Sequence, residues 1–286
     1  VALGVDRDSD LLPPFQLESA HVIYLAPQEA GNDQLFVVPA AGGEPRAFTT
    51  QTPGVWDFAI SADGGTVAFA AARDGSGSAI WLADAAGAAD PARADERLLL
   101  DCPNASCRNV VWAPDGSRLI YERVDFTVAA SSVTDGASLW WVDVATGEAG
   151  PVFQDQQQPG ASARWSPDGT WLSYVTSTNN GLQIYNLRTG ENISLTNLTG
   201  MAALWHPAGS GLLMLDIQPD GARYLTHLIY YDLETREQTD LSLPPVDADG
   251  PSVSYDDSTA ALSPDGEWLA VTRRTVTDDS TAPSNQ

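Results

Sequence analysis

A five-residue phrase that occurs five times constrains the fold of this chain more than any other sequence feature. The clearest copies, at residues 112–116 and 165–169, are Trp-Ala-Pro-Asp-Gly and Trp-Ser-Pro-Asp-Gly, and weaker copies begin at Ile60, Trp205 and Leu262. The fourth residues of successive copies lie 52, 53, 40 and 57 residues apart. Self-similarity at a period of roughly 20–50 residues is typical of propellers and solenoids. The chain is therefore expected to be a repeat protein.

Each repeat unit is expected to contain four antiparallel strands. The Pro-Asp-Gly phrase suits a tight turn, because Pro presets φ and Gly supplies the left-handed residue. An apolar or β-branched run follows each copy, as at residues 171–175, and a second turn signal, such as Thr189-Gly190, ends the strand after it. Four strands in about fifty residues make one blade of a β-propeller. The repeated Asp is accordingly expected to bond its own turn rather than to act in catalysis.

The number of units predicts an all-β fold, a β-propeller of six blades with four antiparallel strands each. Four complete units are flanked by two partial ones, since residues 21–49 lack a first strand and residues 260–272 supply only two strands. Strands from both termini, or sequence beyond Gln286, would close the ring. We expect an N-terminal tail or ring-closing strand over residues 1–19, one propeller over 20–275, and a polar tail over 276–286.

The repeat resembles that of the TolB-like β-propeller family. Blades of that family carry a Trp-Ser-Pro-Asp-Gly turn, an apolar strand, and then a strand ending in Asp-Leu-x-Thr-Gly or a Gly-Gly-Glu-Pro-Arg phrase. Here residues 165–169, 186–190 and 42–48 carry the likeness, which covers about residues 20–275. The resemblance implies the propeller fold. Such domains serve as periplasmic protein-interaction modules, as gating propellers before serine peptidases and as polysaccharide lyases, so function has to be argued from a site.

Acidic residues dominate the charge of the chain. There are 38 Asp and Glu against 14 basic residues, which gives a net charge of −24. An acidic surface repels phosphates, so nucleic acid is excluded as a partner. It attracts cations and basic proteins, although the acidity also has a simpler explanation in solubility. No apolar run of about twenty residues, the length of a transmembrane helix, is present, and a lipid anchor upstream of Val1 stays an open alternative.

The two cysteines, Cys102 and Cys107, are expected to form a disulfide. A Pro-containing loop of this length brings two Cβ atoms within about 4 Å of each other, and such bridges persist in oxidising compartments. Free cytosolic thiols or half of a metal site are the weaker alternatives, because the chain has no second Cys pair and no nearby His. The sequence thus predicts an exported bacterial protein, whether periplasmic, on the cell surface or secreted.

The predicted binding face is the one with the longer connections. In a four-stranded blade the first and third turns lie on one face and the remaining connections on the other. Only this second set varies in length here, and it includes predicted loops at residues 101–109 and 217–224. Variable loops on a rigid scaffold usually carry binding, so we predict that this face holds a basic protein or peptide. The candidate ligand-binding residues are Asp101, Asp155, Asp216, Arg223, Asp247, Asp249, Asp256 and Asp257.

We predict that the chain binds no cofactor, and a bound calcium ion is the alternative. Hard cations prefer clustered carboxylates, and Asp-rich runs occur at residues 6–10 and 247–250. Neither run completes an EF-hand, which favours a solvated tail and loop.

Catalysis has little support in the sequence, and we predict no catalytic residue. His206 replaces the Ser of a blade turn, and no Gly-x-Ser-x-Gly nucleophile motif occurs. The runner-up function is a polysaccharide lyase or hydrolase-like enzyme with a site at the channel mouth, where Arg223 and Tyr224 are the nearest candidates.

Overall fold

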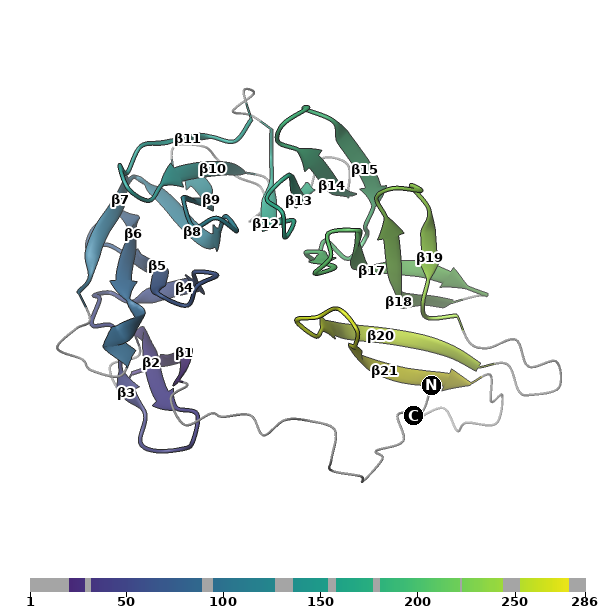
Figure 1. Ribbon diagram of the computed structural model, residues 1–286, viewed down its shortest axis with the longest axis horizontal. Coiled ribbons are helices and arrows are strands. Elements are labelled where there is room, and N and C mark those ends of the chain that lie inside the picture. Colours follow the sequence, from purple (N-terminus) through teal and green to yellow (C-terminus); the bar gives the residue numbers. More distant parts are fainter. Residues whose placement is uncertain are drawn as a thin grey trace, which may run out of the picture.

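The computed structural model is built almost wholly of β-strands. It describes residues 21–28, 32–88, 95–126, 136–153, 158–176, 181–221, 223–243 and 253–277. In this part of the chain twenty-one strands form six antiparallel sheets that follow one another around an arc (Figure 1). No helix in these residues is long and apolar enough to cross a membrane. The expected all-β propeller fold is confirmed.

Four central sheets, numbered 2 to 5 along the chain, each contain four strands that pair in sequence order. Sheet 2 is β4 (Val55–Ile60), β5 (Thr66–Ala72), β6 (Gly77–Asp84) and β7 (Arg97–Pro103), with the short helix η1 (Ala85–Ala88) after β6; sheet 3 is β8 (Ala105–Trp112), β9 (Arg118–Asp125), β10 (Ala137–Asp143) and β11 (Ala149–Pro151). Sheet 4 is β12 (Ala161–Trp165), β13 (Trp171–Thr176), β14 (Gly181–Asn186) and β15 (Asn192–Thr196); sheet 5 is β16 (Leu204–Trp205), β17 (Gly211–Asp220), β18 (Arg223–Asp232) and β19 (Gln238–Asp240).

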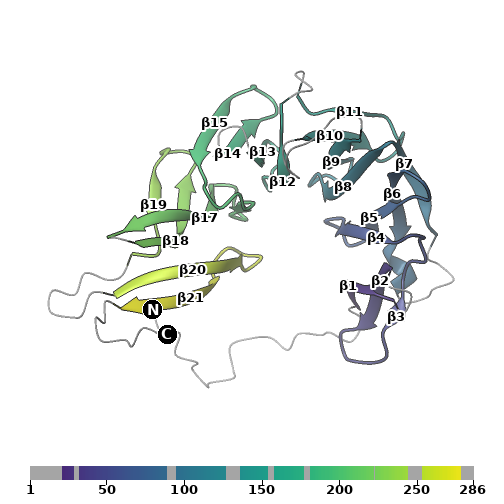
Figure 2. The same ribbon diagram turned by 180° about the vertical axis from the view of Figure 1, so that it is seen from behind.

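The two terminal sheets are incomplete, as the repeat predicts. Sheet 1 has three strands and sheet 6 has two, and they lie on either side of the opening of the arc (Figure 2). Among the described residues no strand pairing joins them, so the count of six blades and the closure of the ring stay predictions. Segments 1–19 and 278–286 lie outside the described residues. The strands are β1 (His21–Pro27), β2 (Asp33–Pro39), β3 (Arg46–Ala47), β20 (Val253–Leu262) and β21 (Leu269–Thr277).

The hydrophobic core lies between consecutive sheets, which pack face to face. Leu172 and Tyr174 of β13 are fully buried on the side of sheet 3, whereas Val175 of the same strand packs toward sheet 5. Similar apolar layers fill the other boundaries along the arc. Because both faces of a central sheet are covered, its strands are apolar on both sides. Trp268, directly before the last strand of sheet 6, is 67% exposed because no described sheet follows sheet 6.

The Pro-Asp-Gly phrase forms the turn between the first two strands of a sheet. Asp168 accepts hydrogen bonds from the Ser166 hydroxyl at 2.6 Å and from the Thr170 backbone N–H at 3.0 Å, and Gly169 has a φ of 69°. The predicted role of the repeated Asp within its own turn is therefore confirmed. The carboxylate bonds its turn in the same way at Asp63, Asp115 and Asp265.

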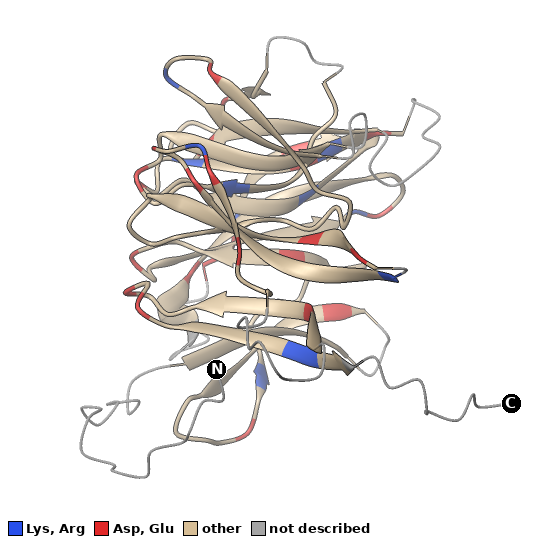
Figure 3. Ribbon diagram, turned by 90° about the vertical axis from the view of Figure 1, so that its right-hand side faces the viewer, with Lys and Arg blue, Asp and Glu red and all other residues tan. Residues whose placement is uncertain are grey.

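The two ends of the sheets differ in their connections. We call the end that carries the first and third turns of each sheet, such as residues 113–117 and 144–148, the turn face, and the other end the loop face. On the loop face, the Ser76 hydroxyl of the β5–β6 connection lies 3.0 Å from Oδ1 of Asn104, which connects β7 to β8. Acidic positions occur at both ends of the sheets and outnumber basic ones along the chain (Figure 3).

Two predicted loops on the loop face are strands in the structure. Residues 217–224 belong to a long hairpin, because β17 and β18 pair as far as Asp220 and Arg223 and Gly221 reverses the chain. Residues 101–109 also lie mostly in β7 and β8. Asn104 alone separates these two strands, with a φ of 60° that Asn adopts more readily than most side chains. The loop predictions for these two segments are wrong.

The disulfide between Cys102 and Cys107 is present, as predicted. It joins the outer strand of sheet 2, β7, to the first strand of sheet 3, β8, and both cysteines are fully buried. The Ser78 hydroxyl accepts a hydrogen bond from the Cys107 backbone N–H at 2.7 Å. The bridge thus holds two consecutive sheets together at the loop face.

Replacing both cysteines by Ala should lower the free energy of unfolding by about 2 kcal/mol, because the unfolded chain gains the freedom that the short loop had removed. Urea unfolding measures this as a lower midpoint. Reductant should shift the parent to the midpoint of the variant and leave the variant unchanged. Equal midpoints for the oxidised parent and the variant would contradict the prediction.

Candidate functional site

Two of the predicted ligand-binding carboxylates are buried and bonded within the protein. Asp216 on β17 is 3% exposed, and it accepts hydrogen bonds from the Leu198 backbone N–H at 2.6 Å and from the Gln218 side chain at 3.0 Å. Asp257 on β20 is 1% exposed and accepts two hydrogen bonds from the Arg273 guanidinium, both at 2.7 Å. Both side chains fix neighbouring segments of the fold.

Asp256, next to Asp257 on β20, also has partners within the protein. Its carboxylate accepts a hydrogen bond from the Thr226 backbone N–H at 2.9 Å and pairs with Arg274 at 2.5 Å. The backbone bond from Thr226 is the main cause of a lowered pKa for Asp256. Asp256 thus links sheet 6 to β18 of sheet 5.

The remaining predicted residues are dispersed. Asp101 at the end of β7 is half exposed and pairs with Arg73 of the β5–β6 connection. Arg223, at the start of β18, lies 3.5 Å from Asp220 across the hairpin tip. Asp155, Asp247 and Asp249 lie outside the described residues, as do both Asp-rich runs considered for calcium. The structure brings Asp256 and Asp257 together but does not gather the described candidates into one pocket, and their role in ligand binding stays a prediction.

A buried histidine, His227, lies near Asp257, and sequence analysis gave it no role. His227 Nδ1 lies 2.7 Å from Asp240 Oδ2, while Nε2 is buried without a hydrogen-bond partner. The hydroxyl of Ser242 accepts a hydrogen bond from the Leu228 backbone N–H at 2.7 Å and donates one to Asp257. In the part of the chain that the structure describes, no group of three or more His, Cys, Asp or Glu is arranged to hold a metal ion.

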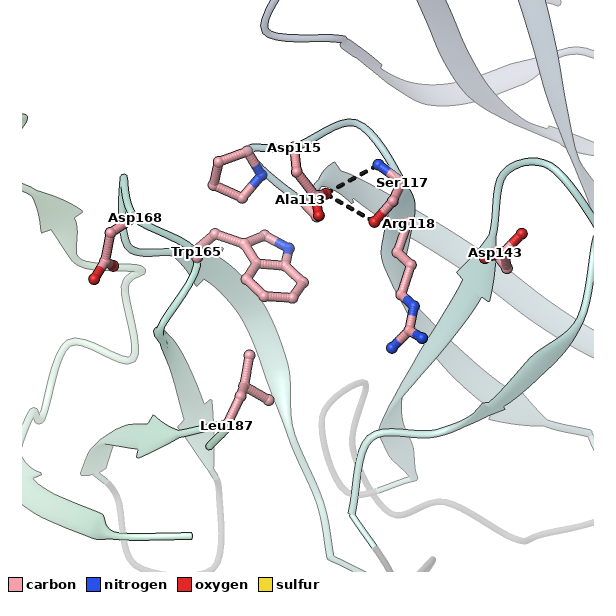
Figure 4. A pocket seen from close by; sticks show the side chains of 10 residues that line it. Ala113, Asp115, Ser117, Arg118, Asp143, Trp165, Asp168 and Leu187 are labelled. Carbon is pink, nitrogen blue, oxygen red and sulfur yellow. Dashed lines mark hydrogen bonds between the residues drawn. The ribbon is translucent and has the colours of Figure 1, made fainter. Parts of the chain in front are cut away.

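A cleft of about 700 Å³ opens on the turn face, between sheets 3 and 4. Trp165 and Leu187 project into it from sheet 4, and Arg118 projects from sheet 3 (Figure 4). Sequence analysis missed this cleft, because its repeated turns looked purely structural. Its lining residues are Ala113, Pro114, Asp115, Ser117, Arg118, Asp143, Trp165, Asp168, Gly169 and Leu187.

Three carboxylates of the cleft are held in the ionised state by their turns. Backbone and hydroxyl hydrogen bonds from Ser117 lower the pKa of Asp115, and those from Thr146 lower the pKa of Asp143. Burial opposes ionisation of Asp168, but its hydrogen bonds within the turn outweigh burial and lower its pKa as well. Against these three charges the cleft contains one cation, Arg118, whose guanidinium lies 4.8 Å from the centre of the Trp141 ring.

The contribution of the Asp257–Arg273 pair in sheet 6 to stability can be tested directly. Replacing Arg273 by Gln leaves a buried carboxylate without its cation and should lower the free energy of unfolding by about 3 kcal/mol at neutral pH. Arg274→Gln is the matched control, because Arg274 is 72% exposed and surface pairs contribute at most about 1 kcal/mol. Equal losses for the two variants would contradict the assignment.

The contribution of the Asp257–Arg273 pair to stability depends on pH in a defined direction. Burial raises the pKa of Asp257, but Arg273 and Ser242 lower it to below its usual value in the folded protein. The pair therefore stabilises the fold above the unfolded pKa of about 3.9 and loses this effect as the pH falls through the folded value. The difference in unfolding free energy between parent and Arg273→Gln should shrink below about pH 4, as measured by urea unfolding from pH 7 to pH 3.

Comparison with known proteins begins with one family model. The model described as the dipeptidyl peptidase IV (DPP IV) N-terminal region matches residues 131–206. This match covers β10 and β11 of sheet 3, all four strands of sheet 4 and β16 of sheet 5. No curated protein shows significant similarity to this sequence.

Solved structures resemble the chain over most of its length. TolB from Acinetobacter baumannii matches with a TM-score of 0.56 and 16% identity over 92% of this chain and 64% of its own. An oligogalacturonate lyase in complex with manganese matches with a TM-score of 0.63 and 16% identity over 95% of this chain and 78% of its own. A puromycin hydrolase matches with a TM-score of 0.56 and 17% identity over 86% of this chain and 41% of its own.

The structural similarity extends along the arc of sheets. The sequence identities of 16 to 17% mean that it shows a shared fold. This chain spans less than two thirds of the Acinetobacter TolB. Together with the sheet order and the repeated Pro-Asp-Gly turns, the similarity shows that this chain has the TolB-like β-propeller fold.

Proposed function

We propose that this propeller is a noncatalytic, exported binding module that holds a basic protein or peptide on its loop face. The excess of acidic over basic residues is the observation that carries the proposal. A net charge of −24 on 286 residues produces a strongly negative potential, which concentrates basic partners near the surface and speeds their association.

Ion pairs within the protein occupy many of its basic side chains, so fewer free cations offset the excess of acidic residues. All 14 basic residues are Arg, and in the described part of the chain six of them pair with a carboxylate, as Arg73 does with Asp101 and Arg236 does with Glu191. These cations are already committed to charges of the same molecule. Because 38 acidic side chains stand against 14 basic ones, ion pairs within the chain leave a large net negative charge.

The loop face is the better candidate surface because its connections vary in length on a rigid base. The disulfide fixes β7 to β8 at this face, and a pre-ordered rim reduces the entropy lost on binding. Binding residues usually occur in such variable connections. Export is supported by the disulfide, since such bonds persist in oxidising compartments, and by the TolB-like fold.

A propeller enzyme is the second candidate function. Two of the similar structures are a lyase and a hydrolase by name, and Tyr224 stands 76% exposed beside Arg223 at the tip of the β17–β18 hairpin on the loop face. An Arg side chain is suited to bind an anionic substrate and a Tyr side chain to transfer a proton, so these two residues are the candidates for such a site. Cleavage of oligogalacturonate that disappears in Tyr224→Phe would favour this candidate.

Charge reversal on the loop face tests the binding proposal. The protein is immobilised, and the partners captured from a cell-envelope extract are measured at 50 to 300 mM salt. The variant Asp247→Lys/Asp249→Lys should capture less of the parent's partner and should show a weaker dependence on salt, because fewer ion pairs are broken by screening. Glu148→Lys/Glu234→Lys, which reverses two exposed charges on the turn face, is the matched control and should behave as the parent. The same salt dependence in parent and loop-face variant would refute the proposal.

A further inference from the structure

The repeated Trp at the end of the first strand bonds across two sheet boundaries but not across the boundary between sheets 3 and 4. The Trp112 indole N–H donates to the Ala59 carbonyl of sheet 2 at 3.1 Å. The Trp205 indole N–H donates to the Arg164 carbonyl of sheet 4 at 3.1 Å. Trp165 occupies the same repeat position, yet its Nε1 is buried without a partner. Since buried N–H groups are nearly always bonded, the site lacks an acceptor that the other two boundaries supply.

The boundary between sheets 3 and 4 also contains a larger cleft than the boundary between sheets 2 and 3. The equivalent cleft between sheets 2 and 3 has a volume of about 160 Å³, against about 700 Å³ between sheets 3 and 4. Corresponding positions line both, with Trp112 in place of Trp165 and Thr66 in place of Arg118. The repeat thus provides an internal comparison, and the wide cleft coincides with the unbonded indole. A volume of several hundred cubic ångströms is typical of ligand sites.

The polar groups of the wide cleft are left with unused bonding capacity. Asp115, Asp143 and Asp168 each use Oδ1 in their own turn. No described residue donates a hydrogen bond to Oδ2 of Asp115 or Asp143, whereas Asp168 is also bonded by the Thr170 side chain. The Arg118 guanidinium makes no hydrogen bond or ion pair with the described residues and contacts the Trp141 ring instead. The cleft therefore offers three anionic acceptors and two kinds of N–H donor.

We propose that this cleft binds an extended peptide segment of a partner protein that carries an Arg side chain. The guanidinium of the partner lies among Asp115, Asp143 and Asp168, and its neighbouring backbone carbonyls accept hydrogen bonds from Trp165 and Arg118. The three carboxylates outnumber the one cation of the cleft, so a cationic ligand is favoured over an anion. A polyamine supplies no acceptor for the indole N–H, whereas a peptide supplies both the cation and the carbonyls.

This inference rests on the proposed function in one respect, since both require a basic protein partner. The cleft would add a second binding surface for the partner, on the turn face. The two surfaces are independent, because the cleft lies on the turn face and the reversed charges at residues 247 and 249 belong to the loop-face proposal.

The indole N–H signal of Trp165 is the direct readout. In ¹⁵N-labelled protein it is assigned as the signal missing from Trp165→Phe, and the probe is the peptide acetyl-Gly-Gly-Arg-Gly-Gly-amide. Titration should shift the Trp165 signal to saturation and leave the already bonded Trp112 and Trp205 indoles unchanged. The same peptide with citrulline, which keeps the shape and loses the charge, should bind about tenfold more weakly. An unchanged Trp165 signal, or equal binding of the two peptides, would overturn the proposal.

Charge-removing variants test the role of the carboxylates. Asn keeps the acceptor that the turn uses, so Asp143→Asn and Asp168→Asn should remain folded and raise the dissociation constant of the Arg peptide by about threefold to fivefold each. Asp232→Asn and Asp265→Asn are the matched controls, because these residues accept the corresponding turn bonds in sheets 5 and 6. Parent-like binding by both cleft variants would overturn the proposal.

One further variant separates the two hypotheses. Asp247→Lys/Asp249→Lys should show the parent's Trp165 shift with the Arg peptide. If this variant captures the partner with the parent's salt dependence while the peptide still shifts Trp165, the loop-face proposal is wrong and the cleft proposal stands. If the peptide has no effect while capture still depends on the loop-face charges, the reverse holds.

Discussion

Face-to-face packing of consecutive sheets is the interaction on which the rest of this structure depends. Each central sheet buries both of its faces, so that neighbouring residues of one strand, such as Tyr174 and Val175, enter different apolar layers. No single sheet could retain its fold alone, because half of its apolar surface is covered by each neighbour. The exposed Trp268 of sheet 6 shows the consequence at the end of the arc, where this cover is missing from the described residues.

Polar groups are arranged around this packing rather than within it. The Asp of each Pro-Asp-Gly turn bonds the backbone next to it, and Asp256 of sheet 6 bonds the Thr226 backbone of sheet 5 across a sheet boundary. Bonds of this kind are directional, so they set the register between sheets that apolar contact leaves loose. The boundary beside Trp165 differs, because the sheets there meet without the indole bond.

The repeat allowed the strands and turns to be predicted closely, and the functional surfaces much less so. Turn chemistry acts over about five residues, so it is visible in the sequence, and the close spacing of Cys102 and Cys107 made their disulfide visible in the same way. The segments at 101–109 and 217–224 were predicted to be loops because they lie between strands that the repeat predicts. A single left-handed residue at Asn104 or Gly221 extended the strands instead.

The carboxylates were harder to place, because their partners are distant in sequence. Asp216 is bonded to Leu198 and Asp257 to Arg273, and nothing in the local sequence separates these buried acids from exposed ones. The wide cleft was missed for the same reason. The bond that closes the equivalent boundary joins Trp112 to Ala59, 53 residues away, and its absence at Trp165 has no local signature.

The sequence by itself determined the four-stranded unit, its turns, the disulfide and the acidic excess, since each depends on composition or on residues close together in the chain. Only the tertiary structure decided which carboxylates are neutralised inside the protein and which boundary between sheets opens into a cleft. Those outcomes depend on contacts between successive repeats. Such contacts form only after the sheets have packed, and similar repeat sequences then differ in which groups they leave without a partner.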